Sequence, residues 1–166
     1  MKKLLFILLV SICSNSWAQE SKITTFILVR HAKKDLTQST NDPDLSAVGK
    51  ARVTKLVELF RSTQIDAIYS TEFKRTRQTV EPLAQDRSIP VMSYQPVVKT
   101  DIDLMLQKHV GQTILVSGHS NTVPTMVNYL IGEDKYKTFD DADYGNVIIV
   151  SVIERGKNTK VVWMQY

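Results

Sequence analysis

The chain has little cysteine, and what it has lies close to its beginning. Among 166 residues the single cysteine is Cys13. A disulfide framework, a thiol nucleophile and a cysteine-based metal site are therefore excluded for everything after that position. The excess of positive over negative charge is also small, because the formal net charge is only +4. A surplus this small argues against nucleic acid as a partner, so the fold and the function must rest on an apolar core and a few polar side chains.

Long apolar runs are missing as well, except at the N-terminus. Two lysines precede an apolar run over residues 4–12, and a small-x-small pattern ends at Ala18. This predicts a secretory signal peptide over residues 1–18, cleaved near Ala18, and a single periplasmic or secreted domain over residues 19–166. The run is too short to span a bilayer, so we expect no stable membrane insertion after cleavage. Lipidation at Cys13 stays open.

The rest of the chain alternates short apolar runs with helical patterns. Strands are predicted at 25–29, 66–70, 90–92 and 113–117, and a C-terminal hairpin is predicted to pair 146–153 with 160–165. Helices are predicted at 46–61, 73–85 and 101–110, and a further helix is predicted to end at Gly132. Pro82 is expected to end or kink its helix. Helices that alternate with buried strands predict one α/β domain, a three-layer α/β/α sandwich with a mostly parallel central sheet.

Two of the three histidines directly follow a β-branched run. His31 follows the first strand and Arg30, and His119 follows the strand at 113–117 and Gly118. Ligands of open α/β sheets bind at the carboxyl ends of the strands, so this placement indicates a pocket for an anion. The alternative is that each histidine only caps its strand by bonding a neighbouring loop.

Histidine and arginine together suit phosphoryl chemistry. A neutral imidazole can attack phosphorus, and neighbouring cations keep it neutral. The planar fork of an arginine suits the phosphoryl oxygens. Arg75 is predicted in the first turn of a helix that follows a strand, where free N–H groups also favour an anion. A solvated basic face that includes Lys74 and Arg77 is the alternative interpretation.

Taken in order, four motifs resemble those of the histidine phosphatase superfamily, which includes the phosphoglycerate mutases. They are Arg30-His31-Ala32, Leu45-Ser46-Ala47-Val48-Gly49, the segment from Ser70 to Thr79, and Gly118-His119-Ser120. The resemblance implies a phosphoglycerate mutase-like fold and His31 as the nucleophile that becomes phosphorylated. It also implies that Arg30 and Arg75 hold the phosphoryl oxygens, that His119 donates a further hydrogen bond, and that neither a metal nor an organic cofactor is needed.

Two departures from the family pattern bear on the substrate. Ala32 replaces the usual glycine, as in the small branch that includes phosphohistidine phosphatases. Many members carry a carboxylate after the middle motif as general acid, but residues 89–99 contain none, and the nearest are Glu72, Asp101 and Asp103. General acid catalysis contributes about 10²- to 10⁴-fold, so alkyl phosphates should react slowly, whereas phosphoramidates, acyl phosphates and aryl phosphates should suffer less.

The expected function is that of an exported, cofactor-independent phosphatase. It would hydrolyse a small phosphorylated molecule or a phosphorylated peptide through a covalent phosphohistidine. Two alternatives stay open, namely a non-catalytic phosphate-binding domain of the same fold and a zinc hydrolase using His31 and His119. The zinc reading lacks a spaced third ligand. The acidic turn at 140–143 is expected to be solvated, and Tyr129, Tyr136 and Tyr144 either line the pocket mouth or pack against the sheet.

Overall fold

The computed structural model describes residues 21–96 and 98–166, so the predicted signal peptide, its cleavage near Ala18 and the open question of Cys13 lie outside the described residues. Within them, ten elements follow one another in the order β1 (Thr24–Arg30), α1 (Ala47–Leu59), β2 (Ala67–Ser70), α2 (Lys74–Asp86), β3 (Val91–Ser93), α3 (Lys99–Lys108), β4 (Thr113–Gly118), α4 (Thr122–Ile131), β5 (Asn146–Glu154) and β6 (Asn158–Gln165). The elements alternate as predicted for an α/β domain.

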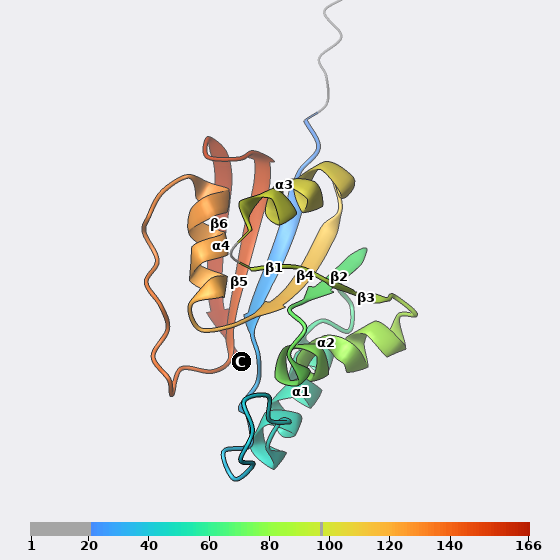
Figure 1. Ribbon diagram of the computed structural model, residues 1–166. Helices are drawn as coiled ribbons and strands as arrows, with labels where there is room; N and C mark the ends of the chain where they lie inside the picture. Colours follow the sequence, from blue (N-terminus) through green and yellow to red (C-terminus); the bar gives the residue numbers. More distant parts are fainter. Residues whose placement is uncertain (1–20, 97) are drawn as a thin grey trace, which may run out of the picture.

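One twisted sheet contains all six of these strands (Figure 1). Their spatial order is β3-β2-β4-β1-β5-β6. The four strands from β3 to β1 pair in parallel, whereas β5 is antiparallel to both β1 and β6. The predicted, mostly parallel sheet is therefore confirmed, with the C-terminal hairpin supplying its antiparallel edge.

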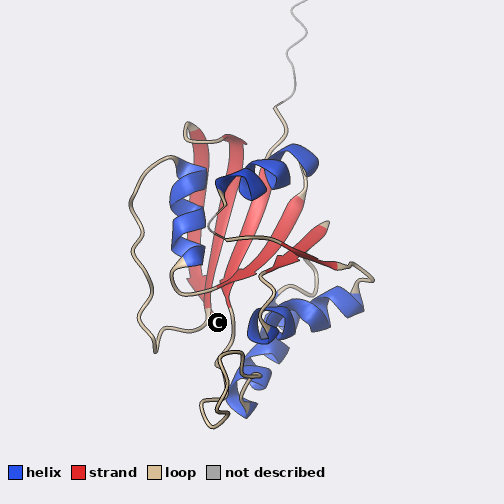
Figure 2. Cartoon of the chain, in the orientation of Figure 1, coloured by secondary structure: helices blue, strands red, loops and turns tan. Residues whose placement is uncertain are grey.

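Alternation along β1 explains why the sheet is covered on both faces. Phe26 and Leu28 pack with residues of α3 and α4 in one apolar cluster, and Ile27 and Val29 pack with residues of α1 and α2 in another. Figure 2 shows the two helix pairs on opposite sides of the strands. Because successive side chains of a strand point to opposite faces, an uninterrupted apolar run predicts such a three-layer arrangement. The three-layer sandwich is confirmed.

The ends of the helices follow local chemistry in most cases. Ser46 is the N-cap of α1, as predicted, and its Oγ accepts a hydrogen bond from the Gly49 amide at 3.1 Å. Gly132 closes α4 with a φ of 73°, a left-handed conformation that glycine adopts at low cost. Pro82, expected to end or kink its helix, does not end it, because α2 packs its buried face against the sheet and continues to Asp86.

The third helix has the predicted length but lies two residues earlier in the chain than predicted. It ends at Lys108 rather than beside Gly111, and Gly111, with a φ of 77°, lies in the turn that leads to β4. Among the described helices none is long and apolar enough to cross a bilayer.

Candidate active site

Strand pairing brings the two predicted histidines together. In the parallel register of β1 and β4, Arg30 lies opposite Gly118, so His31 and His119 are the next residues on neighbouring strands. The His31 amide donates to the Gly118 carbonyl at 2.9 Å, which ties the two loops where they leave the sheet. The imidazole centroids lie 5.5 Å apart in an edge-to-face arrangement. Both rings thus reach one site at the carboxyl ends of the strands.

The two predicted arginines join the histidines from different elements. Arg30 closes β1, and Arg75 lies in the first turn of α2, as predicted. All four side chains line one open cavity of about 860 Å³. Figure 1 shows that β1 and β4 end and β5 begins at this end of the sheet. The sequence-predicted His31, His119, Arg30 and Arg75 are therefore neighbours in space.

Contacts with the protein hold both guanidinium groups in place and leave the Nε–H of each without a hydrogen-bond partner among the described residues. Nη1 of Arg30 donates to the carbonyls of Asp140 and Asp143 at 2.8 and 2.9 Å, and its guanidinium lies 4.1 Å from the centre of the Tyr144 ring. Arg75 lies 4.3 Å from the centre of the Phe73 ring. The Nε atoms of both arginines are buried and have no hydrogen-bond partner within the described part of the chain. Both arginines therefore line the cavity from fixed positions.

A single hydrogen bond sets the tautomer of His31. Its Nδ1 lies 2.8 Å from the carbonyl oxygen of Ala32. A carbonyl only accepts, so Nδ1 carries the proton and Nε2 keeps its lone pair. Burial lowers the pKa of His31, and the charges of His119, Arg75 and Arg30 lower it as well, while the Ala32 bond opposes them; together they bring the pKa to about 3. At neutral pH the ring is therefore an uncharged base with a free Nε2.

A chain of hydroxyl groups sets the tautomer of His119. The Thr76 hydroxyl shares its one proton between the Phe73 and Thr71 carbonyls, at 2.7 and 3.0 Å. The Thr71 hydroxyl then has to donate to Thr76 Oγ1, 2.8 Å away. Thr71 Oγ1 is left to accept from Nε2 of His119 at 3.0 Å, so Nε2–H is the donor and Nδ1 is the nitrogen that titrates. Burial, with Arg75 and Arg30, lowers the pKa of His119 to about 4.

The end of the middle motif supports the residues around His31. Thr79 Oγ1 accepts from the Ala32 amide at 2.9 Å and donates to the Arg75 carbonyl at 2.7 Å. Gln78 accepts from the Leu45 amide at 2.9 Å, so α2 also holds the loop that follows the first motif. Thr79 therefore connects Arg75 to the backbone next to His31.

The three carboxylates suggested as general acids are not brought to the cavity. Asp101 accepts from the Gln95 amide at 2.8 Å, in a turn beside α3. Asp103 accepts from the Tyr129 hydroxyl at 2.8 Å and pairs with Arg155 at 3.3 Å. Glu72 is exposed, and none of the three is among the residues that line the cavity. Local capping and surface pairing account for Asp101 and Asp103.

The structure adds residues to the site that were not predicted as functional, and it places one of the candidate tyrosines there. Thr71 reaches His119 because β2 and β4 are paired, and Tyr144, one of the three tyrosines considered for the pocket mouth, does line the cavity. Asp42 pairs with Arg75 at 3.5 Å and accepts from the Lys74 amide at 3.0 Å, which caps α2 from a distant loop. These contacts join segments far apart in the chain, so no local sequence pattern predicts them.

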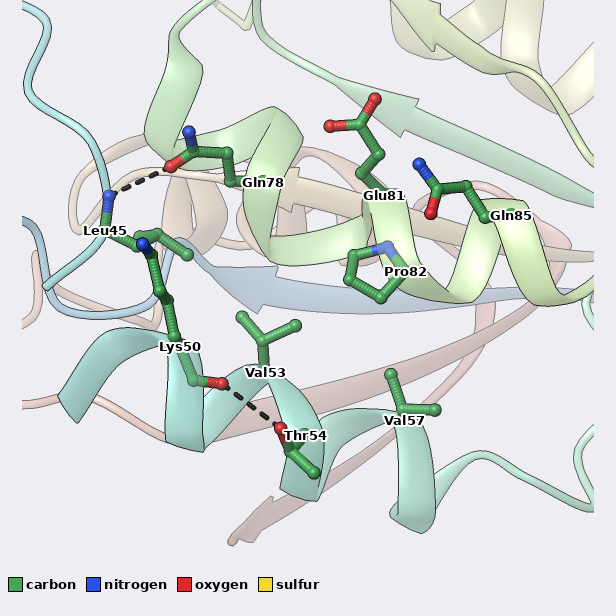
Figure 3. Close-up of a pocket in the computed structure, with 9 residues that line it drawn as sticks. All are labelled: Leu45, Lys50, Val53, Thr54, Val57, Gln78, Glu81, Pro82 and Gln85. Atoms are coloured by element: carbon green, nitrogen blue, oxygen red, sulfur yellow. Dashed lines mark hydrogen bonds between the residues drawn. The ribbon is translucent and has the colours of Figure 1, made fainter. Parts of the chain in front are cut away.

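Another hollow lies between α1 and α2 (Figure 3). Its volume is about 510 Å³, and Val53, Val57 and Pro82 are among its apolar lining residues. Neither histidine nor arginine lines it, so it offers no counterpart of the chemistry at the strand ends. Across the described residues, no cluster of three or more histidine, cysteine or acidic side chains is arranged to hold a metal ion.

Comparison with solved structures identifies the class of fold. The protein histidine phosphatase SixA in complex with tungstate superposes with a TM-score of 0.67 and 15% identity, over 85% of this chain and 96% of that one. A phosphoserine phosphatase from Entamoeba histolytica, a mutant in complex with phosphoserine, gives 0.63 and 15% over 86% of this chain and 95% of that one. The chain therefore has the predicted phosphoglycerate mutase-like fold.

The sequence comparison finds a match to a known family over part of the chain. The model of the histidine phosphatase superfamily (branch 1) matches residues 26–96, a segment with three of the four motifs, and this confirms the predicted resemblance. Phosphoserine phosphatase 1 of Hydrogenobacter thermophilus is 32% identical over 80 residues, 45% of this chain. The match spans only 38% of that protein.

Proposed function

We propose that this protein is a phosphatase that transfers a phosphoryl group to Nε2 of His31 and then to water. The observation that carries the proposal is the free Nε2 of a neutral histidine in a cavity that two arginines also line. In the first step the N–P bond forms as the bond from phosphorus to the leaving group breaks, and the leaving group keeps the electron pair. In the second step water attacks phosphorus, the N–P bond breaks, and inorganic phosphate departs.

Each neighbouring side chain has a role in this proposal. Arg30 and Arg75 hold the phosphoryl oxygens, because guanidinium groups bind such oxygens with charge-assisted hydrogen bonds. An incoming dianion favours protonation of His119, which then becomes a donor to the transferring group through Nδ1. No step needs a metal or an organic cofactor.

The direct test is hydrolysis of para-nitrophenyl phosphate by the purified domain in the presence of EDTA. We expect turnover in the wild type and none in His31→Ala, with Lys55→Met, on the exposed side of α1, as a matched surface control. Full activity in His31→Ala would refute the assignment of the nucleophile.

A non-catalytic phosphate-binding domain is the second candidate, favoured by the absence of Glu72, Asp101 and Asp103 from the cavity lining. The two candidates differ in their dependence on the leaving group. A phosphatase without a carboxylic acid should hydrolyse phosphoramidates and aryl phosphates faster than alkyl phosphates. A binding domain should hold phosphate and hydrolyse none of the three.

Export is part of the proposal and rests on the sequence. The N-terminal pattern over residues 1–18 supports secretion to the periplasm or beyond, with a phosphorylated small molecule or peptide as substrate there. The mass of the protein recovered outside the cytoplasm tests this point. It should match a chain that begins at Gln19, and a chain that keeps residues 1–18 would contradict it.

A further inference from the structure

One tyrosine lies beside the reacting histidine and has no role in the transfer described above. Tyr144 lines the cavity, and the centre of its ring lies 6.1 Å from that of the His31 ring, in an edge-to-face arrangement. The same ring lies 4.1 Å from the Arg30 guanidinium. Burial lowers the pKa of Arg75, and Asp42 and Tyr144 oppose this lowering, so the tyrosine is also within electrostatic reach of the second arginine. Tyr144 is therefore a neighbour of the nucleophile and of both arginines.

The backbone on both sides of this tyrosine is anchored. Before it, the Asp143 amide donates to the Asp140 carbonyl at 3.0 Å, and Arg30 donates to the carbonyls of both residues. After it, the Gly145 carbonyl accepts from the Tyr166 amide at 3.1 Å, next to the paired strands β5 and β6. The side chain thus reaches the cavity from a fixed segment and loses little conformational entropy when it contacts a ligand.

The hydroxyl of Tyr144 is available to a ligand. The hydroxyls of Tyr69, Tyr94 and Tyr129 each bond to another residue of the protein. The Tyr144 hydroxyl bonds to none of the described residues, although its side chain is half-buried. A tyrosine hydroxyl both donates and accepts, so it can give a proton to one reaction partner and receive it back from another.

The transfer to His31 leaves one oxygen of a phosphate ester without a donor. Arg30, Arg75 and His119 supply N–H groups for the three phosphoryl oxygens, whereas the bridging oxygen takes up the electron pair as the leaving group departs. The carboxylates first suggested as acids do not line the cavity. Tyr144 does line it, and its ring contacts both His31 and Arg30. A phenol is thus present where a carboxylic acid was expected.

We propose that Tyr144 is a catalytic residue that gives its hydroxyl proton to the leaving group. This inference rests on the proposed function. As the bond from His31 to phosphorus forms, the bond from phosphorus to the bridging oxygen breaks, and that oxygen keeps the electron pair and takes the proton of Tyr144. In the second step the attacking water returns a proton to the tyrosine oxygen, the N–P bond breaks, and inorganic phosphate departs. Arg30 and Arg75 stabilise the negative charge on the tyrosine oxygen between the two steps.

The test compares phenyl phosphate with para-nitrophenyl phosphate, because phenolate depends far more than nitrophenolate on a proton in order to leave. The quantity measured is kcat/KM for phenyl phosphate divided by kcat/KM for para-nitrophenyl phosphate, so that intrinsic differences between the esters cancel when variants are compared. Tyr144→Phe keeps the ring beside Arg30 and removes only the hydroxyl. We expect this ratio to fall about 100-fold in Tyr144→Phe, the lower end of what general acid catalysis contributes. Tyr136→Phe, whose ring packs on Trp163, is the matched control and should leave the ratio unchanged.

Activity on para-nitrophenyl phosphate also shows that each variant is folded. An equal loss on both esters in Tyr144→Phe, or no loss on either, would overturn the inference. The same variant series includes Asp141→Asn, because Asp141 is the one acidic residue among the described residues that line the cavity. A loss confined to phenyl phosphate in Asp141→Asn, with the ratio unchanged in Tyr144→Phe, would overturn the inference and assign the proton to Asp141.

A binding measurement separates this inference from the proposed function. If the wild type hydrolyses neither ester, the proposed function fails, and the affinities for phenyl phosphate and phenylphosphonate are then measured by calorimetry. Phenylphosphonate lacks the bridging oxygen. Tyr144→Phe should weaken the binding of phenyl phosphate about threefold or more and leave that of phenylphosphonate unchanged, which would support the contact with the bridging oxygen even without transfer. An equal effect on the two ligands would overturn it.

Discussion

At the scale of single residues, hydrogen-bond direction decides what the two histidines can do. Each ring has one nitrogen occupied by the protein, Nδ1 in His31 and Nε2 in His119. The nitrogen left free therefore differs between the two rings. This difference suits one histidine to attack and the other to take up a proton as an anion arrives.

Replacement of Thr71 by valine should disturb His119 without changing the size of the buried side chain. Thr71 is 2% exposed, and its hydroxyl is the acceptor for Nε2–H. We expect ¹⁵N NMR shifts of His119 to report the Nε2–H tautomer in the wild type and in Thr71→Ser, and a mixture of tautomers in Thr71→Val. We also expect kcat/KM to fall about tenfold in Thr71→Val, since a group that orients a reactive side chain typically contributes on this scale. Identical His119 spectra in the serine and valine variants would contradict the proposed hydroxyl chain.

The sequence predicts the site residues better than it predicts the residues that support them. Arg30, His31 and His119 adjoin strand ends, which apolar runs reveal, and Arg75 belongs to an ordered motif. Thr71 and Asp42 act through partners 48 and 33 positions away in the sequence, so their roles arise only when the chain folds. The suggested acids Asp101 and Asp103 do not line the cavity, because proximity in sequence to a motif does not place a side chain there.

At the scale of elements, α1 depends on its N-cap. Ser46 Oγ accepts from the Gly49 amide and donates to the Lys33 carbonyl, so it connects the helix to the loop after β1. We expect Ser46→Ala to lower the free energy of unfolding by about 1 kcal/mol, the usual cost of losing such a cap. Urea denaturation measures this change. Ser62→Ala, in the exposed turn after α1, is the control and should change stability by less than about 0.5 kcal/mol; equal losses in the two variants would contradict the capping role.

Strands are predicted more accurately than helix ends for a physical reason. The run at 25–29 is buried on both faces and continues as β1, because each side chain has a layer of helices to pack against. The end of α3 and the continuation of α2 through Pro82 are decided by packing against the sheet, which competes with the local signals of Gly111 and Pro82.

At the scale of the whole molecule, burial of two neutral histidines links stability to pH. The pKa of His31 is lowered to about 3 and that of His119 to about 4, from an ordinary value of 6.5. Between pH 6.5 and 4 the unfolded chain therefore binds more protons than the folded one, so stability falls as the pH falls through this window and is regained above it. Each histidine contributes at most about 1.4 kcal/mol per pH unit.

The free energy of unfolding measured by urea denaturation at pH 7, 6, 5 and 4.5 tests this linkage. We expect a decline in the wild type and a flatter profile in the double variant His31→Asn, His119→Gln. Hydrogen bonds hold the pKa of Asp66 below its usual value of 3.8, so its contribution is lost mainly below this window. Equal slopes in the wild type and the double variant would show that other groups cause the decline.

Fold class follows from the sequence because it depends on repeated patterns over the whole chain. Alternating strands and helices with short connections leave few arrangements, and the parallel register of β1 and β4 then places the two histidines side by side. The size of the cavity was not predicted. It depends on how the loop after β1, α1 and the segment before β5 meet in space.

In the proposed mechanism a phosphoryl group is held on His31, and trapping this phosphohistidine is the most direct test. The wild type is mixed with ³²P-labelled phenyl phosphate, quenched within milliseconds in alkali, digested and analysed by mass spectrometry. We expect label on the peptide that contains His31, stable in alkali and released by acid, and no label in His31→Ala. Turnover by the wild type with no labelled protein, or with the label on a different residue, would contradict it.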